Sequence, residues 1–167
     1  AQGVPNYFGE QRFGHDGGNL VEAQTLIERD QLKGNRSGTG MYLSAARSWL
    51  FNLVLAERLR RDCWQSPLDG EIEPSGPLWG RGRSVVTGDL ADLEQTVLAN
   101  WQSWCYALEH AGLQQERRPL ILRPQSMAWR RLQSDQLELS FVLASGCFAT
   151  VILREVAELF RPQFKPL

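Results

Sequence analysis

The sequence predicts a globular protein of mixed class, α/β (α+β), in which helices dominate and strands are few. Two long segments, at about residues 41–62 and 89–110, repeat apolar side chains at the spacing of an amphipathic α-helix. Residues 137–143 alternate apolar and polar side chains, as a strand with one buried face does. The composition, 43% hydrophobic and 22% charged, is ordinary for a folded globular chain.

Length and charge limit the classes of protein to which the chain can belong. A chain of 167 residues buries about 70% of its unfolded surface, so it needs no metal or disulfide to fold. Its 18 Lys+Arg balance 19 Asp+Glu, which excludes a strongly basic binder but leaves local basic patches open. No apolar run reaches the roughly 18–20 residues that cross a bilayer, and no signal peptide is visible. We expect no membrane partner and no obligate protein partner.

The cysteines and histidines are few and scattered. Three cysteines without a C-x-x-C pair do not favour a disulfide framework, and they indicate a reducing cytoplasm. A zinc site could form only by long-range convergence of these cysteines with the two histidines, so we predict no metal. Cys105 and Cys147 have apolar neighbours and are expected in the core, whereas Cys63 follows a charged segment.

The helical spacing also shows where basic side chains gather. The helix at 41–62 is apolar around most of its circumference, so most of it should be buried. Arg47, Arg58 and Arg61 nevertheless fall within about 60° of one another at about 100° per residue. They form either an ordinary solvated face, with Arg61 complementing the helix dipole, or a functional basic surface.

A second basic segment lies in an irregular stretch, residues 65–84. There GPLWGRGR combines Trp79 with Arg81 and Arg83 on flexible glycines. Such a loop could contact a phosphate backbone and stack on a base. It could equally dock Trp79 into the core.

Two short segments near opposite ends of the sequence carry the most suggestive side chains. NYFGEQRF (6–13) offers an amide that can read a base edge and rings that can stack on a base. SGCF (145–148) joins a strand to a final helix, whose backbone N–H groups favour an anion. The common nucleotide-binding and hydrolase motifs are absent. The chemistry of the residues alone therefore indicates only a possible nucleotide-reading surface.

Four segments of the chain resemble the TruD family of pseudouridine synthases, in the family's order. They are GVPNYFGEQRFG (3–14), YLSAARSWLFN (42–52), GPLWGRG (76–82) and SGCFATVILRE (145–155). The resemblance implies isomerisation of uridine to pseudouridine in transfer RNA, typically at position 13, without cofactor or metal. In such enzymes a catalytic Asp attacks the flipped-out nucleotide, and the base detaches, rotates and rejoins through carbon.

The resemblance also implies an architecture. It places a mostly helical TruD-specific insertion domain at residues 33–122. Residues 1–32 and 123–167 would be two pieces of a partial, mixed-sheet catalytic domain.

Three residues match positions with a role in the family. Asn6 matches the Asn that contacts the target uridine, and Phe8 matches the Phe that lines the same pocket. Phe148 matches the Phe of a G-S-F-A-T segment that contacts the base, although Cys replaces Ser here. For both phenylalanines the alternative is an ordinary place in the core. Glu10 and Arg12 are expected to hold the loop by pairing with each other or with the backbone.

The chain departs from the family pattern at two points. The family's catalytic Asp lies upstream of the V-P-N-Y-F motif near a K-D-R pattern, and no Asp of this chain stands in that context. We therefore expect the catalytic residue upstream of Ala1 and assign none within the chain. Only five residues separate Gly70 from Gly76, fewer than in the family, so we expect residues to be missing there.

Two functions remain open from the sequence. The first is a tRNA pseudouridine synthase whose nucleophile lies outside this chain. The second is a catalytically inactive RNA-binding or RNA-chaperone module, in which basic residues carry the affinity for RNA. Those candidate RNA contacts are Arg47, Arg58, Arg61, Arg81 and Arg83.

Overall fold

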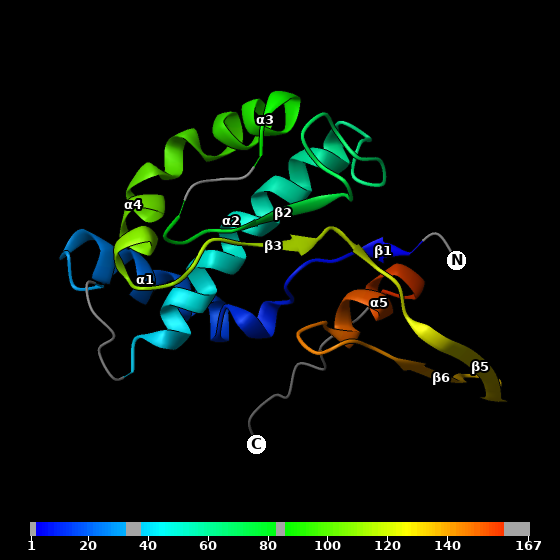
Figure 1. Cartoon of the computed structure of the whole chain (residues 1–167). Coiled ribbons are helices and arrows are strands. Elements are labelled where there is room, and N and C mark those ends of the chain that lie inside the picture. Colours follow the sequence, from blue (N-terminus) through cyan, green and yellow to red (C-terminus); the bar gives the residue numbers. More distant parts are fainter. Residues whose placement is uncertain (1–2, 33–37, 83–85, 159–167) are drawn as a thin grey trace, which may run out of the picture.

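The computed structural model describes residues 3–32, 38–82 and 86–158 (Figure 1). The helices are α1 Gly18–Glu28, α2 Gly40–Arg60, α3 Gly88–Leu98, α4 Gln102–His110 and α5 Ala149–Val156. The strands are β1 Val4–Pro5, β2 Ser75–Leu78, β3 Glu116–Pro119, β4 Ile121–Leu122, β5 Gln125–Gln133 and β6 Gln136–Val142. Helices with small antiparallel sheets make this an α+β protein. None of the helices in the described ranges is long and apolar enough to cross a membrane.

Helix α2 lies at the centre of the main core. Leu43, Ala46, Leu50 and Val54 are all buried, and the helices α1, α3 and α4 surround them (Figure 1). These residues repeat three or four positions apart, so they share one helix face. Burying a Leu or Val side chain contributes about 1.5–3 kcal/mol to folding. The predicted burial of this helix is confirmed.

The helix predicted from Asp89 to His110 is broken in two. Helices α3 and α4 are joined by a 3-10 turn, Ala99–Trp101, where Trp101 leaves helical geometry and packs edge to face on Trp104. Asp89 lies inside the first turn of α3, and Thr87 holds the N-cap position. The two halves can then lie at an angle and follow the surface of α2.

The described strands form three two-stranded antiparallel sheets, pairing β1 with β4, β2 with β3 and β5 with β6. Strand β2 can cross α2 closely because Gly76 has no side chain. A Cβ at this position would lie 2.9 Å from the Phe51 ring. Leu120, between β3 and β4, is buried with Phe8 and Phe51 in a second, smaller core. Phe148, which precedes α5, packs against this second core, so the core joins residues from near the two ends of the described chain.

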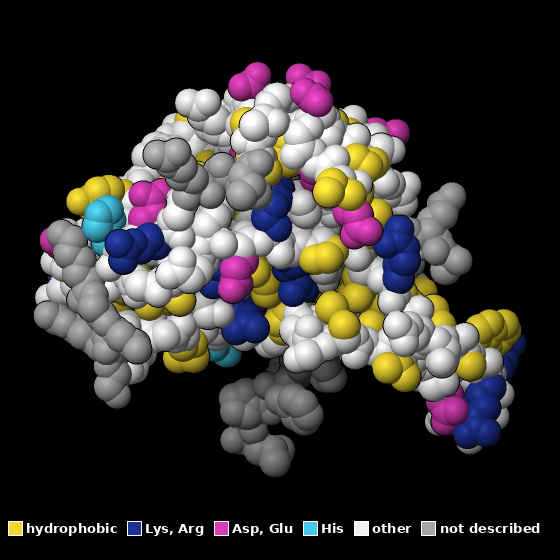
Figure 2. Space-filling view, viewed as in Figure 1, with side chains coloured by type: hydrophobic (Ala, Val, Ile, Leu, Met, Phe, Trp, Pro, Cys, Tyr) yellow, Lys and Arg dark blue, Asp and Glu magenta, His cyan; other side chains and the backbone are white. Residues whose placement is uncertain are grey.

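The β5–β6 hairpin projects from the body of the molecule (Figures 1 and 2). Leu137 and Leu139 lie on one face of the hairpin, as the alternation predicts. Across the hairpin, Trp129 faces Leu139 and Arg131 faces Leu137. Burial of this face is not observed, because Trp129 is 70% exposed and Leu137 58% exposed. A two-stranded hairpin with an uncovered apolar face is marginally stable in water.

Candidate active site

Residues 6–13 form the opening segment of the site, and Asn6 anchors this segment on the chain between β3 and β4. Its backbone N–H donates to the Leu120 carbonyl at 2.8 Å, and its Nδ2 donates to the Pro119 carbonyl at 2.8 Å. Its Oδ1 accepts from Arg118 Nη2 at 2.7 Å. Asn6 is only 4% exposed, and two hydrogen bonds fix the orientation of its side-chain amide.

Phe8 is held by helix α2 on one side and by the C-terminal part of the chain on the other. Asn52 of α2 accepts from the Phe8 N–H and donates to the Phe8 carbonyl, each at 3.0 Å. The Phe8 ring packs edge to face on Phe51 at 5.5 Å between centroids and on Phe148 at 5.8 Å. The structure thus brings Phe8 and Phe148 together.

Phe148 immediately precedes helix α5 and is half-buried. Val151 and Ile152 of α5 are buried, which fixes the helix against the core. At the surface Arg154 Nη2 lies 2.6 Å from Glu10 Oε1, so α5 is also tied to the opening segment. The expected pairing of Glu10 with Arg12 is wrong, because the partner of Glu10 is Arg154.

Arg118 of β3 connects all three predicted site residues, and the sequence analysis did not single it out. Besides Asn6, it donates from Nη1 to the Gly146 carbonyl at 3.0 Å, two residues before Phe148. Its guanidinium carbon lies 4.2 Å from the centroid of the Phe8 ring. The only signal in the sequence is a basic pair before Pro119, which does not reveal this geometry.

Arg12, which belongs to the opening segment, is the second arginine of the site. Its Nη1 donates to Ser44 Oγ of α2 at 3.0 Å, and its guanidinium carbon lies 5.6 Å from the ring centroids of both Phe8 and Phe148. Burial lowers the pKa of Arg118 from its ordinary value; the neighbouring Cys147 opposes this shift, and the positive charge of Arg12 adds to it. Burial raises the pKa of the neighbouring Tyr7 phenol, and the charge of Glu155 adds to that shift. The site therefore combines aromatic rings with concentrated positive charge.

The predicted basic surface on α2 is only partly available. Arg58 is wholly buried, forms an ion pair with Glu71 and donates to the carbonyls of Cys63 and Ser66. The prediction that Arg58 contacts RNA is therefore wrong, because a guanidinium without exposed surface cannot reach a phosphate. Arg47 is 14% exposed, and its Nη2 donates to the carbonyls of Leu78 and Gln114.

The remaining candidate RNA contacts are Arg61, Arg81 and Arg83. Arg61 is 44% exposed and paired with Glu57, and Arg81 is exposed. Arg83 lies outside the described residues. The contact of Arg47, Arg61, Arg81 and Arg83 with RNA stays a prediction.

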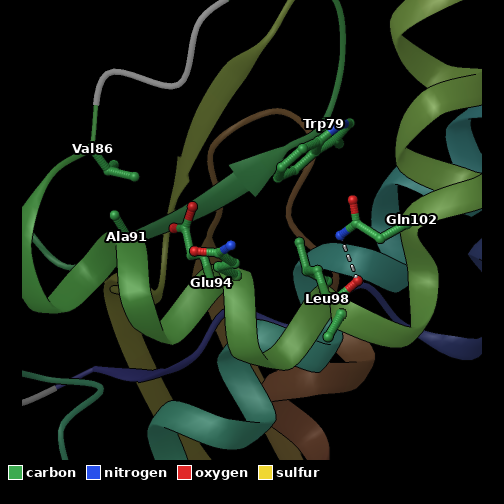
Figure 3. A pocket seen from close by; sticks show the side chains of 8 residues that line it. Trp79, Val86, Ala91, Glu94, Leu98 and Gln102 are labelled. Atoms are coloured by element: carbon green, nitrogen blue, oxygen red, sulfur yellow. Dashed lines mark hydrogen bonds between the residues drawn. The ribbon is translucent and has the colours of Figure 1, made fainter.

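Trp79 takes the structural alternative that the sequence left open. It packs against the main core, and its Nε1 donates to Glu109 Oε1 at 2.9 Å. Beside it lies a cavity of about 440 Å³ between β2 and α3, which includes Glu94 and Gln102 (Figure 3). Burial raises the pKa of Glu94 although Arg117, 2.7 Å away, opposes the shift. Asn6, Phe8 and Phe148 do not line this cavity.

Comparison with known proteins identifies the family. The family model described as tRNA pseudouridine synthase D (TruD) matches residues 68–156. A protein named tRNA pseudouridine synthase D from Cellvibrio japonicus is 49% identical over 165 residues, which cover 98% of this chain. The chain belongs to the TruD family. Proteins of the same name from Shewanella oneidensis and Pseudomonas aeruginosa are 43% and 40% identical and cover 93% and 95% of the chain.

The chain spans about half the length of the curated relatives it matches. It covers 49% of the Cellvibrio and Shewanella proteins and 52% of the Pseudomonas aeruginosa protein. The matches to the last two run over 183 and 186 residues, more than the 167 of this chain, so those TruD proteins carry additional residues within the match. That these residues fall between Gly70 and Gly76 stays a prediction.

The polar groups at the site are an amide and two guanidinium groups. Within residues 3–32, 38–82 and 86–158, no three His, Cys, Asp or Glu side chains converge as metal ligands would. The groups that can act on a nucleotide here are the Asn6 amide, the two phenylalanine rings and the two guanidinium groups.

Proposed function

We propose that the protein containing this chain is a tRNA pseudouridine synthase, which isomerises uridine, typically at position 13, without cofactor or metal. Membership of the TruD family supports the reaction class. The observation that carries the proposal is the junction of Asn6, Phe8 and Phe148 through Arg118, where segments that resemble the family motif converge. We place the protein in the cytoplasm, where its tRNA substrate is found.

In this proposal the chain supplies the binding half of the active site. Phe148 presents aromatic surface to an extruded uracil, since stacking of a base on a ring contributes about 1–3 kcal/mol. Phe8, which is almost fully buried, packs on Phe148 and holds that ring in place. Asn6 stands at the edge of the rings, with its amide oriented by Pro119 and Arg118. The nucleophilic Asp comes from the part of the relatives' length that this chain does not cover. The rest of the active-site pocket is formed by that same part.

The proposed domain division is a TruD insertion at 33–122 between two pieces, 1–32 and 123–167, of a mixed-sheet catalytic domain. Helix α1 belongs to the first piece, yet its Ala23 is buried in the same core as Leu50 of α2. The catalytic piece and the insertion would therefore share a core along α1 rather than meet at a flexible linker.

The test compares the 167-residue chain with the protein extended to the length of its relatives. We expect the extended protein to convert uridine to pseudouridine in tRNA and the chain alone to bind tRNA without turnover. Turnover by the chain alone would show that the nucleophile lies within it. Binding without turnover by the extended protein would favour the alternative, an RNA-binding or RNA-chaperone module.

A further inference from the structure

Arg12 and Arg118 are half-buried arginines that no carboxylate neutralises within the described residues. None of the acceptors of their side-chain hydrogen bonds is a carboxylate: a serine hydroxyl for Arg12, and an amide oxygen, a carbonyl oxygen and the Cys147 side chain for Arg118. By contrast, Arg47 and Arg117 lie 3.7 and 2.7 Å from glutamate oxygens, and Arg58 also pairs with a glutamate. Among the described residues, the other poorly exposed arginines are thus paired with a carboxylate, and these two are not.

Leaving both charges uncompensated is costly. A charge removed from water without an opposite charge loses several kcal/mol of solvation. The Nε atoms of Arg12 and Arg118 are both buried and have no hydrogen-bond partner, so each fork also retains an unused donor. Both guanidinium carbons lie over the same Phe8 ring, at 5.6 and 4.2 Å from its centroid. This arrangement of donors suits a ligand that is negative and carries several acceptor oxygens.

A phosphate group has these properties, because its oxygens match the planar fork of an arginine and can accept from two of them at once. The N-terminal end of α5, which begins at Ala149 next to Phe148, adds a favourable dipole for an anion. Phosphates flank every nucleotide of an RNA strand, so one lies close to any base held against the Phe148 ring.

We propose that Arg12 and Arg118 together bind a backbone phosphate of the RNA, beside the nucleotide that Phe8 and Phe148 hold. This site rests on the proposed function, since that function supplies the RNA. In this proposal the two arginines fix the RNA strand, and the aromatic side chains contact the base.

The test measures tRNA affinity against salt concentration in the extended protein and in its Arg12→Gln and Arg118→Gln variants. Each lost phosphate contact should reduce the log–log salt slope by about 0.7–0.9. The matched control is Arg60→Gln, because Arg60 is 70% exposed and already paired with Glu57. We expect the control to keep the wild-type slope. Unchanged slopes in both Arg12→Gln and Arg118→Gln would overturn the proposal.

A carboxylate from another part of the protein could occupy the same place, and the experiment separates it from phosphate. In that case Arg118→Gln would lower the thermal midpoint of the free protein and leave the salt slope unchanged, which contradicts the proposal. Isomerisation of uridine is measured separately. If the extended protein turns over but the variants keep the wild-type salt slope, only the phosphate site is refuted. If the variants have reduced slopes but the extended protein does not turn over, only the proposed enzymatic function is refuted.

The unsubstituted protein provides a second measurement if the variants fail to fold. Cys147 is an electrostatic neighbour of Arg118 and is partly exposed, as Cys63 is elsewhere. Inorganic phosphate should slow alkylation of Cys147 by iodoacetamide relative to chloride at equal ionic strength. Cys63 should react equally in both salts. Equal rates at Cys147 in the two salts would contradict the proposal.

Discussion

The rings of Phe8 and Phe148, from near the two ends of the described chain, lie edge to face with centroids 5.8 Å apart. Phe8 is almost fully buried and Phe148 only partly, so the two rings serve different purposes. Phe8 completes the small core with Phe51, while Phe148 retains a surface that a ligand can reach.

Replacing Phe148 by Leu should therefore reduce turnover more than stability. In the extended protein we expect a fall of about 5- to 150-fold in turnover, the equivalent of the 1–3 kcal/mol that base stacking contributes. Affinity for tRNA should change little, because many backbone contacts remain. Phe13→Leu is the matched control, since the Phe13 ring packs edge to face on Trp49 and forms no ring pair with Phe8 or Phe148 in the described structure. A loss of tRNA affinity in proportion to turnover would contradict the role of Phe148 in the pocket.

Replacing Arg58 by Met should destabilise the fold without altering the salt dependence of tRNA binding. Removing one partner of a buried ion pair costs about 3–5 kcal/mol, because the other charge stays buried. Glu71 also accepts from the N–H groups of Leu68 and Ser75, so its loop should loosen as well. Denaturant unfolding measures the free energy of unfolding. Adding Glu71→Gln to the Arg58→Met variant should restore part of the lost free energy. A changed salt dependence of tRNA binding in the Arg58→Met variant would show that Arg58 does contact RNA.

Glu57 should make a pH-dependent contribution to stability. Hydrogen bonds from Arg60, then Arg61, lower its pKa to about 2. A carboxylate whose pKa is lowered on folding stabilises the folded state above its unfolded pKa. That contribution is lost as the pH falls from about 4.5 towards about 2. The difference in unfolding free energy between the protein and its Glu57→Gln variant should be present at pH 7 and shrink across this window. A difference independent of pH would disprove the assignment.

The β5–β6 hairpin should be the least protected sheet in the 167-residue chain. Among the described residues, no third strand pairs with its two strands, and Trp129 and Leu137 are exposed. Hydrogen exchange of its amides should be faster than that of β2–β3, which is packed against α2. Equal protection of the two sheets would show that the apolar face is covered.

Local patterns in the sequence predicted the helices well and their ends less well. The apolar repeat of α2 fixed both its extent and its buried face, because helical geometry places those side chains together whatever surrounds them. Asn is a residue type favoured at helix N-caps, yet Asn19 lies inside α1, which begins at Gly18, and its side chain donates to the Arg12 carbonyl. That contact depends on where the segment containing Arg12 folds back onto α1, which no local pattern contains.

By itself, the sequence determined the α+β class, the main helices, and Asn6, Phe8 and Phe148 as residues of interest through family resemblance. The tertiary structure alone decided that Arg58 is buried with Glu71, although its helical position matches a basic stripe. It also decided that Arg118 joins Asn6 to the segment before α5. Periodicity reports which side chains share a face, whereas burial and pairing depend on contacts between residues far apart in the chain.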